Sequence, residues 1–507
     1  MKINIGKTGK NFISVLFIAA FISGCSDFLE EQDRSNFTAD NYFTNATQAE
    51  SSVNAAYAGL ASIYHGGYGF GGGLSPWLML EFATGYANTE LGEAFDNHNV
   101  RNLTNSSDNS EGNVWWVQSY RAIANANLAI SKIPGIIMDE TRKSHFLGEV
   151  RFLRAYYYYN LVRIFGKVPL ITEPVDLNSP DMYPQQDSEE DIYNQIVADL
   201  VAAESSGLPF LDPTGRVSLG AVKSLLASVY LTMAGYPLQK GTAYYQLAAD
   251  KANEVITSNN YTLYPSYDDL HNPALENKGE FILQVQFTSL VSPSFWQSAI
   301  VPYNKGISRY DGQSGAIFAE LPFVNSYEAG DKRTEEKQFY YTTYTLNSDR
   351  TVTINLGNHY IYKLFDVSAQ TSTASSGLNW TVMRYPEVLL IYAEASNEVS
   401  GPTPAAYTAL NLIRRRANLL PDLSGLTKDQ FREAVWREIY HELAYENKTW
   451  FTMVRTRKAF DVATRNFNDY IGHQFSYGPV LGQKDLLFPI PTSEMNSNPN
   501  LDQNTGY

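Results

Sequence analysis

The C-terminal quarter of the chain carries the residues most similar to a metal site. His441-Glu442 begins as the zinc-protease motif H-E-x-x-H does, but Tyr445 stands where the second histidine ligand is required. Glu438, Glu442 and Glu446 recur every four residues and therefore share one face of a helix. Three carboxylates can bind a cation, but we favour the alternative of a face that is solvated or paired with arginine. The seven histidines are scattered without metal-ligand spacing, so we predict no metal site.

Two other patterns could support catalysis, and neither has the context it needs. Residues 67–72 fit the spacing GxGxxG of a dinucleotide-binding loop, but they follow a predicted helix where that motif follows a strand. A glycosidase needs two carboxylates on opposite sides of a sugar bond, and 53 acidic residues leave such a pair possible. No recognisable hydrolase motif accompanies any of them. We predict no catalytic residue and no cofactor, and a cryptic hydrolase stays open as an alternative.

Aromatic side chains are the other candidates, because they make up 13% of the chain and include 35 Tyr and 7 Trp. Sugar binding requires flat apolar faces with amides, carboxylates or guanidinium groups at the rim. Trp77 and Tyr86 lie in a Gly-rich segment, and Trp296, Tyr303 and Tyr310 lie in a second segment rich in Ser and Pro. We predict these five residues as the ligand-binding set. Trp380 is a weaker candidate, whereas Trp115 and Trp116 have helical spacing with later apolar residues and are predicted to be core.

The N-terminus resembles a bacterial lipoprotein signal. Three lysines precede the apolar stretch 12–22, which has the length of a signal peptide and is too short to span a bilayer. The only cysteine, Cys25, follows Ile22-Ser23-Gly24 as in a lipobox, where the sulfur is acylated after cleavage. We therefore expect residues 1–24 to be removed and Cys25 to be lipidated, the alternative being an ordinary signal peptide with an incidental cysteine.

Charge excludes one class of partner. The chain has 38 basic and 53 acidic residues and a net charge of −15, so nucleic-acid binding, which depends on Lys and Arg, is not expected. The acidic segment after Cys25 resembles the signal that sends some lipoproteins to the outer face of the Gram-negative outer membrane. We divide the chain into a signal peptide (1–24), a lipidated acidic tether (25–40) and one body (41–507).

Helical periodicity dominates that body, so we predict a mainly α fold. One helix has apolar residues from Phe146 to Ile164 and stops at Gly166. Others begin at caps Ser218 and Thr403, and Thr427 opens one that continues to about Glu446. Residues 222–256 and 389–417 are similar to tetratricopeptide helix pairs.

The remaining segments of the body are predicted to be irregular. We expect two non-helical stretches, 66–113 and 286–380, with no strand-rich block. Short strands are predicted over 281–287, 351–356 and 360–364. The body then has an N-terminal half (41–275) and a C-terminal half (276–507) that carries the loop-rich insertion 286–380. Long irregular segments on a helical frame commonly carry binding function.

Several stretches spread over the whole mature chain resemble the SusD/RagB family of outer-membrane lipoproteins. The first is Cys25-Ser-Asp-Phe-Leu-Glu, and the ending Leu487-Phe-Pro-Ile-Pro-Thr-Ser-Glu is another. Between them, the sequences at 148–169, 384–395 and 442–455 also match, as does Asn498-Pro-Asn-Leu near the end. Jointly these motifs are specific to the family.

The resemblance implies a helical fold with tetratricopeptide-like units and no known catalysis. It implies a cell-surface lipoprotein that sits as a lid on a TonB-dependent β-barrel transporter and delivers an oligosaccharide to it. Family members place sugar-stacking aromatics in an N-terminal loop and in an insertion of the C-terminal half, and Trp77 and Trp296 occupy comparable places. A peptide-capturing lipoprotein of the same transporter-lid architecture is the alternative function.

Overall fold

The computed structural model of the chain describes residues 42–65, 76–92, 96–175, 182–303, 305–307, 313–346, 348–370 and 376–507. The chain divides into two units, Met1–Thr44 and Asn45–Tyr507, and the elements below belong to the second. The expected signal peptide, Cys25, the tether and Tyr310 lie outside the described residues. Within the described ranges, every helix is too short or too polar to cross a membrane.

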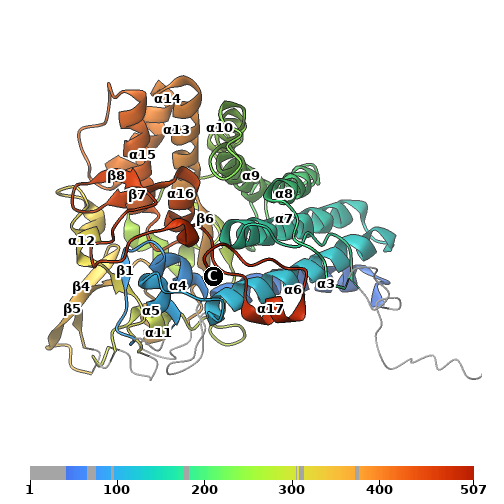
Figure 1. Cartoon of the computed structure of the whole chain (residues 1–507), viewed down its shortest axis with the longest axis horizontal. Helices are drawn as coiled ribbons and strands as arrows, with labels where there is room; N and C mark the ends of the chain where they lie inside the picture. The colour runs from blue at the N-terminus through green and yellow to red at the C-terminus, as the bar shows by residue number, and fades with distance from the viewer. Residues whose placement is uncertain are drawn as a thin grey trace, which may run out of the picture. The chain divides into compact units, whose positions relative to one another are not determined.

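The N-terminal half is a series of helices in which each long helix packs on the next along the chain (Figure 1). The predicted ends at Gly166 and Ser218 are confirmed: Gly166 caps its helix at φ +73°, and the Ser218 hydroxyl accepts a hydrogen bond from the Ala221 N–H. The long helices are α3 (Ala46–Tyr64), α6 (Ser110–Lys132), α7 (Glu140–Phe165), α8 (Glu189–Glu204), α9 (Leu219–Ala234) and α10 (Thr242–Thr257).

The C-terminal half contains four more helices that pack into the frame: α13 (Tyr385–Ser400), α14 (Pro404–Arg416), α15 (Lys428–Glu442) and α16 (Thr449–Thr456). Helix α13 packs against α10, α14 and α15, so helices of the two halves are in direct contact. The predicted capping box of Thr427 and Gln430 is present. Helix α15 ends at Glu442 rather than near Glu446, because Tyr445 and Asn447 adopt left-handed backbone conformations that end a helix.

Short strands are present in segments that the sequence predicted to be mostly irregular. A four-stranded antiparallel sheet has the order β1-β3-β5-β4, and its strands are few and short, as expected for a mainly α fold. Two of its strands contain two residues each, too few for alternation to show in a sequence. The sheet strands are β1 (Ala87–Asn88), β3 (Phe318–Ala319), β4 (Tyr340–Thr345) and β5 (Thr353–Ile361). Two antiparallel sheets of two strands each add β2 (Phe281–Val285) with β6 (Trp380–Arg384) and β7 (Lys458–Asp461) with β8 (Asn466–Asp469).

The stretch 66–113 also differs from its prediction, because it contains two helices and the start of α6. Both are short, which explains why no periodicity reveals them. The remaining short elements are α4 (Pro76–Phe82), α5 (Asp96–Arg101), α11 (Gln297–Ile300), α12 (Leu321–Val324), α17 (Thr492–Ser497) and the 3₁₀ turns Ile133–Gly135, Tyr267–His271, Pro273–Leu275, Lys332–Thr334 and Gln483–Leu486.

Buried ion pairs hold the C-terminal half together. The three-glutamate face of α15 and its extension is paired with arginine, as favoured from the sequence: Glu438 Oε2 lies 2.9 Å from Arg333 Nη1, and Glu446 Oε1 lies 2.8 Å from Arg384 Nη2. Glu442 lies between them and is ion-paired with both arginines. Among the described residues no group of His, Cys, Asp and Glu is arranged to hold a metal ion.

His441, which opens the incomplete zinc-protease motif, has a structural role. It is buried, its ring stacks on Tyr327 with centroids 4.0 Å apart, and its Nε2 lies 3.1 Å from the Ser326 hydroxyl. Burial, together with nearby arginines, lowers the pKa of this imidazole well below its ordinary value. The histidine is therefore neutral and packed in the core.

Candidate functional site

The two tryptophans predicted to bind ligand lie in an aromatic cluster inside the protein. Trp77 belongs to α4, every residue of which is buried, and Trp296 directly precedes α11; both side chains are 0% exposed. Trp380 lies between them, with its ring centroid 4.9 Å from that of Trp77 and 6.0 Å from that of Trp296. Tyr64 stacks on Trp380 at 5.2 Å. The prediction that Trp77 and Trp296 lie on exposed loops is wrong.

The physical reason is the large apolar area of an indole ring. Gly, Ser and Pro around Trp77 and Trp296 indicated exposed loops, but a ring that can pack against other aromatic rings is stabilised by burial and by edge or stacked contacts. Trp115 and Trp116 are buried, which confirms their assignment to the core. Trp115 Nε1 donates to the carbonyl of Pro76 at 2.8 Å, which fixes the start of α4 against α6.

Tyr86, another predicted residue, lines a pocket beside β1. The pocket has a volume of about 470 Å³. Tyr86 is itself mostly buried, because its ring stacks on Phe323 at 4.6 Å and its hydroxyl donates to the carbonyl of Phe460 at 2.9 Å. We call this hollow the β1 pocket; the side chains that define it are Tyr86, Glu320, Phe323, Phe460, Asp461, His473, Phe475 and Tyr477.

The β1 pocket combines aromatic rings with charged groups. Arg101 lies 3.6 Å above the ring of Tyr477 and forms an ion pair with Glu320, so it ties the aromatic wall to the acidic one. The Asp461 carboxylate accepts hydrogen bonds from the backbone N–H groups of Ala463 and Thr464 at 2.9 and 3.2 Å. Burial raises the pKa of Asp461, but these hydrogen bonds outweigh it and leave the pKa below its usual value.

The imidazole of His473 lies in the same wall of the β1 pocket, and its charge also matters for a ligand. Burial lowers the pKa of His473, so the ring is neutral at physiological pH. Carboxylates accept hydrogen bonds, and the neutral imidazole can donate or accept. Faces of apolar rings beside such acceptors are the combination that binds the CH face and the hydroxyls of a sugar ring.

Tyr303 is the predicted residue that remains open to solvent. Its side chain is 51% exposed, and its backbone N–H donates to Glu90 Oε2 at 2.7 Å. The other Glu90 oxygen accepts from the hydroxyl of Tyr360 on β5. Tyr86 directly precedes β1 and Glu90 follows its last residue by two, so a fully extended chain would put them about 13 Å apart. Strand β1 thus connects the pocket to the exposed Tyr303.

Sequence reasoning missed Arg101, Glu320 and Tyr477, although part of the signal was present. Phe475 and Tyr477 alternate in a segment that contains Ser476 and Gly478, which is the same composition that singled out Trp77. Nothing in the sequence indicates the ion pair of Arg101 with Glu320, because the two residues are far apart in the chain and meet only through the sheet.

Comparison with known proteins assigns the chain to a family. Residues 296–507 match the family model described as the SusD family, and residues 27–231 match one described as starch-binding associating with outer membrane. A crystal structure of a SusD superfamily protein from Parabacteroides distasonis is 41% identical, covers 93% of this chain and 100% of its own, and superposes with a TM-score of 0.87. The chain belongs to the SusD family. The mainly α fold is thereby confirmed.

Other members of the family extend this likeness. SusD-like protein P2 from Formosa agariphila is 28% identical, over 98% of this chain and 99% of its own length. Surface glycan-binding protein A from Bacteroides thetaiotaomicron, solved in complex with laminarihexaose, is 20% identical; it covers 91% of this chain and 100% of its own, with a TM-score of 0.73. At 20% identity, the likeness to surface glycan-binding protein A shows a shared fold alone.

Proposed function

We propose that this SusD-family protein captures an oligosaccharide at the cell surface and delivers it to a TonB-dependent transporter of the outer membrane without changing it chemically. The observation that carries the proposal is a pocket with aromatic walls and two carboxyl groups, in a chain that shares its fold with a glycan-binding protein. The family description of starch binding in association with the outer membrane supports the ligand class and the location.

The β1 pocket is our proposed site for the sugar. The ring of Tyr477, which lies beside the buried ring of Phe475, would lie against the CH face of one sugar unit, and the carboxylates of Glu320 and Asp461 would accept hydrogen bonds from its hydroxyls. Tyr303, at the other end of β1, would contact a neighbouring unit of the same chain. Trp77 and Trp296 are buried in the aromatic cluster around Trp380 and do not line this pocket.

The proposed anchor and the family support the proposal of delivery to a transporter. Lipidation at Cys25 would hold the protein at the membrane, and the residues after it would serve as a tether between lipid and body. A stable lid on a β-barrel transporter would bury more than about 1,000 Å². Gentle detergent extraction followed by mass spectrometry tests this partnership, and recovery as a free monomer under all conditions would contradict it.

A glycan array probed with the full chain carrying Cys25→Ala tests the ligand class. We expect binding to a restricted set of oligosaccharides and no new reducing ends after prolonged incubation with those glycans. Release of reducing ends would show a hydrolase, and capture of peptides with no glycan bound would favour the alternative function.

A further inference from the structure

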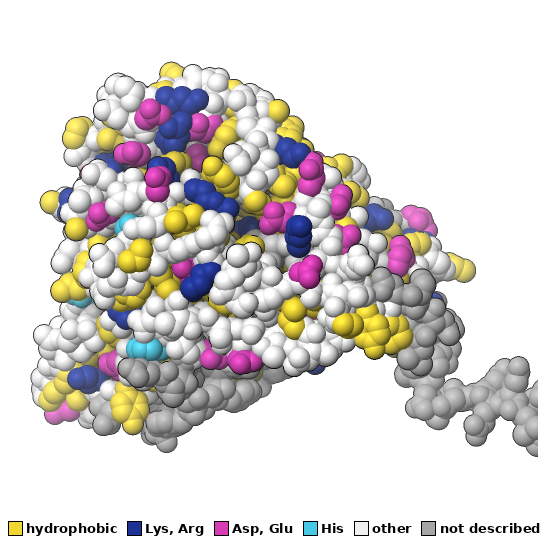
Figure 2. Space-filling view, viewed as in Figure 1, with side chains coloured by type: hydrophobic (Ala, Val, Ile, Leu, Met, Phe, Trp, Pro, Cys, Tyr) yellow, Lys and Arg dark blue, Asp and Glu magenta, His cyan; other side chains and the backbone are white. Residues whose placement is uncertain are grey.

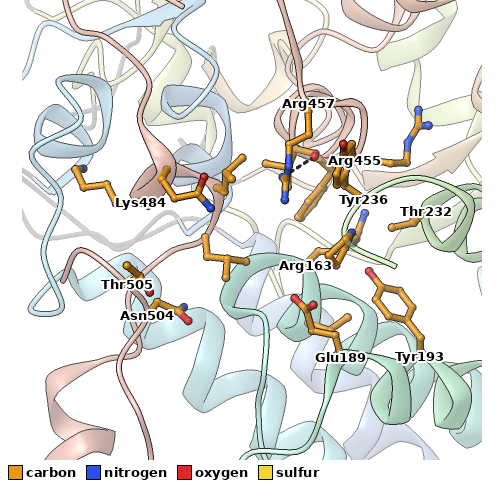
Figure 3. Close-up of a pocket in the computed structure, with 17 residues that line it drawn as sticks. Arg163, Glu189, Tyr193, Thr232, Tyr236, Arg455, Arg457, Lys484, Asn504 and Thr505 are labelled. Atoms are coloured by element: carbon orange, nitrogen blue, oxygen red, sulfur yellow. Dashed lines mark hydrogen bonds between the residues drawn. The ribbon is translucent and has the colours of Figure 1, made fainter. Parts of the chain in front are cut away.

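A second pocket lies between α7, α9, α16 and the chain that follows the 3₁₀ turn Gln483–Leu486 (Figure 3). Its volume, about 180 Å³, is smaller than that of the β1 pocket. Drug-sized ligands occupy roughly 300–1,000 Å³, so this pocket accepts about one ring. The two pockets share no lining residue.

Two arginines in its wall have no carboxylate partner among the described residues. Arg163 lies between the rings of Tyr159 and Phe451, 3.6 Å from each centroid, and its Nε donates to the carbonyl of Tyr159. Arg457 donates from Nη1 to the carbonyl of Val454 at 2.8 Å. Both guanidinium groups donate hydrogen bonds to neutral groups, and the negative charge that acts on Arg457 from within the wall is that of Glu189.

The other two cations of the wall differ in this respect. Arg455 forms a bidentate ion pair with Glu394 at 2.7 and 2.8 Å, and Lys484 is ion-paired with Asp485. Their charges are neutralised inside the protein. The contrast identifies Arg163 and Arg457 as the groups with charge available to a ligand.

Glu189 is the acidic residue of the wall, and its carboxylate can also interact with a ligand. It stands in the first turn of α8, and no hydrogen bond or ion pair is formed by its carboxylate within the described part of the chain. In Figure 3 the carboxylate projects into the pocket between Arg163 and Asn504. Burial raises its pKa, while Arg457 and Lys167 act in the opposite direction. With this acid and two arginines, the pocket has one surplus positive charge.

Neutral groups complete the wall. The Asn504 amide donates to the carbonyls of Phe165 and Phe488 at 2.9 and 2.7 Å, which fixes its orientation and leaves its oxygen as an acceptor. The ring of Tyr236 is 38% exposed, and the guanidinium of Arg457 lies 4.8 Å from its centroid. Hydroxyl acceptors, an aromatic ring and a surplus guanidinium charge therefore surround one ring-sized space.

We propose that this pocket binds a single carboxylated sugar ring of the hexuronate class, either free or at the end of a glycan. The guanidinium of Arg457 binds the carboxylate, with Arg163 adding charge, because a guanidinium matches a carboxylate in charge and geometry. Glu189 and Asn504 accept hydrogen bonds from the sugar hydroxyls. Glu189 also repels a compact anion such as sulfate, which has charge but no hydroxyl to donate.

Titration of the full Cys25→Ala chain with four small probes tests this site. We expect D-glucuronate to bind, and we expect D-glucose, acetate and sulfate to bind at least about tenfold more weakly. Each comparison removes one feature: glucose lacks the carboxylate, acetate lacks the hydroxyls, and sulfate lacks the sugar ring. Equal affinity for glucose and glucuronate, or for sulfate and glucuronate, would overturn the proposal.

Single substitutions test whether glucuronate binds in this pocket. Arg457→Gln should lower glucuronate affinity by roughly 10- to 150-fold. Its matched control is Arg415→Gln, because Arg415 is an exposed arginine paired with Asp422 outside the pocket and should not affect the titration. Unchanged affinity in a folded Arg457→Gln protein would overturn the proposal.

Arg457 has a left-handed backbone conformation, with φ +56°, so a substitution there could disturb folding. A second variant, at Glu189, therefore tests the same site without changing Arg457. Glu189→Gln removes the repulsion of compact anions, and sulfate should then compete with glucuronate; continued exclusion of sulfate would contradict the assigned role. Tyr477→Ala, in the β1 pocket, should leave glucuronate binding intact. This variant separates failure of the present proposal from failure of the oligosaccharide site.

Discussion

Arg384 and Glu442 form an ion pair deep in the protein, with Arg384 Nη1 2.6 Å from Glu442 Oε1 and side chains that are 2% and 0% exposed. Arg384 ends β6 and precedes α13, whereas Glu442 ends α15, so the pair joins two distant parts of the sequence. Arg384 is also ion-paired with Glu280 and Glu446. One guanidinium therefore contacts three buried carboxylates, and Arg416, Arg333 and Lys363 supply the other positive charges of the cluster.

Arg384→Met should destabilise the protein by about 3–5 kcal/mol, because it removes one of the cations that balance these buried carboxylates. Denaturant unfolding followed by circular dichroism measures this change. Arg415→Gln is the control, since an exposed pair contributes about 1 kcal/mol or less. A loss below about 1 kcal/mol for Arg384→Met would show that the cluster does not hold the C-terminal half together.

Glu81 should make stability depend on pH. Burial raises the pKa of this carboxyl from 4.5 to about 7, although it accepts hydrogen bonds from the backbone and side-chain N–H groups of Asn447. A raised pKa means that the folded state favours the protonated acid, so the group costs stability increasingly as pH rises from about 4.5 to 7.

Glu81→Gln should remove that cost while keeping an oxygen for Asn447. Relative to the native protein, the variant should gain roughly 3 kcal/mol of unfolding free energy between pH 4.5 and pH 8. Urea unfolding of both proteins at the two pH values measures the difference, in which the other titrating groups cancel. An identical difference at both pH values would contradict the assignment.

Truncation to alanine should lower stability strongly at a core aromatic residue and very little at a surface one. Trp77→Ala opens a cavity in the aromatic cluster and should cost about 3–5 kcal/mol of stability. Tyr303→Ala, at a half-exposed position, should change stability by only about 0.5 kcal/mol. Thermal melts of the two variants compare them directly; an unchanged melting temperature for Trp77→Ala would contradict its place in the core.

Cys25→Ala should release the protein from the membrane. No described helix could span a bilayer, and the proposed lipid is the anchor. Cell fractionation with an antibody against the protein measures the soluble share. Normal membrane retention of the variant would contradict the lipoprotein assignment.

Local signals in the sequence predict the helices well, whereas contacts between distant residues could not be predicted. The cap of Thr427 with Gln430 and the stop at Gly166 depend on neighbours within a few residues, and both are correct. Burial of Trp77 depends on Trp380, about three hundred residues later, and no local pattern reveals that packing. The β1 pocket could not be predicted for the same reason, because its walls come from distant parts of the chain, near residues 86, 320 and 475.

Titration calorimetry of Tyr477→Ala tests the central claim, that the β1 pocket binds oligosaccharide, most directly. The titrant is the glycan selected by the array, and the control is Tyr183→Ala, an exposed tyrosine that lines neither pocket. Loss of an aromatic face against a sugar should cost about 1–3 kcal/mol, or roughly a 5- to 150-fold loss of affinity. We predict that loss for Tyr477→Ala and native affinity for Tyr183→Ala. Native affinity in a folded Tyr477→Ala protein would contradict the account.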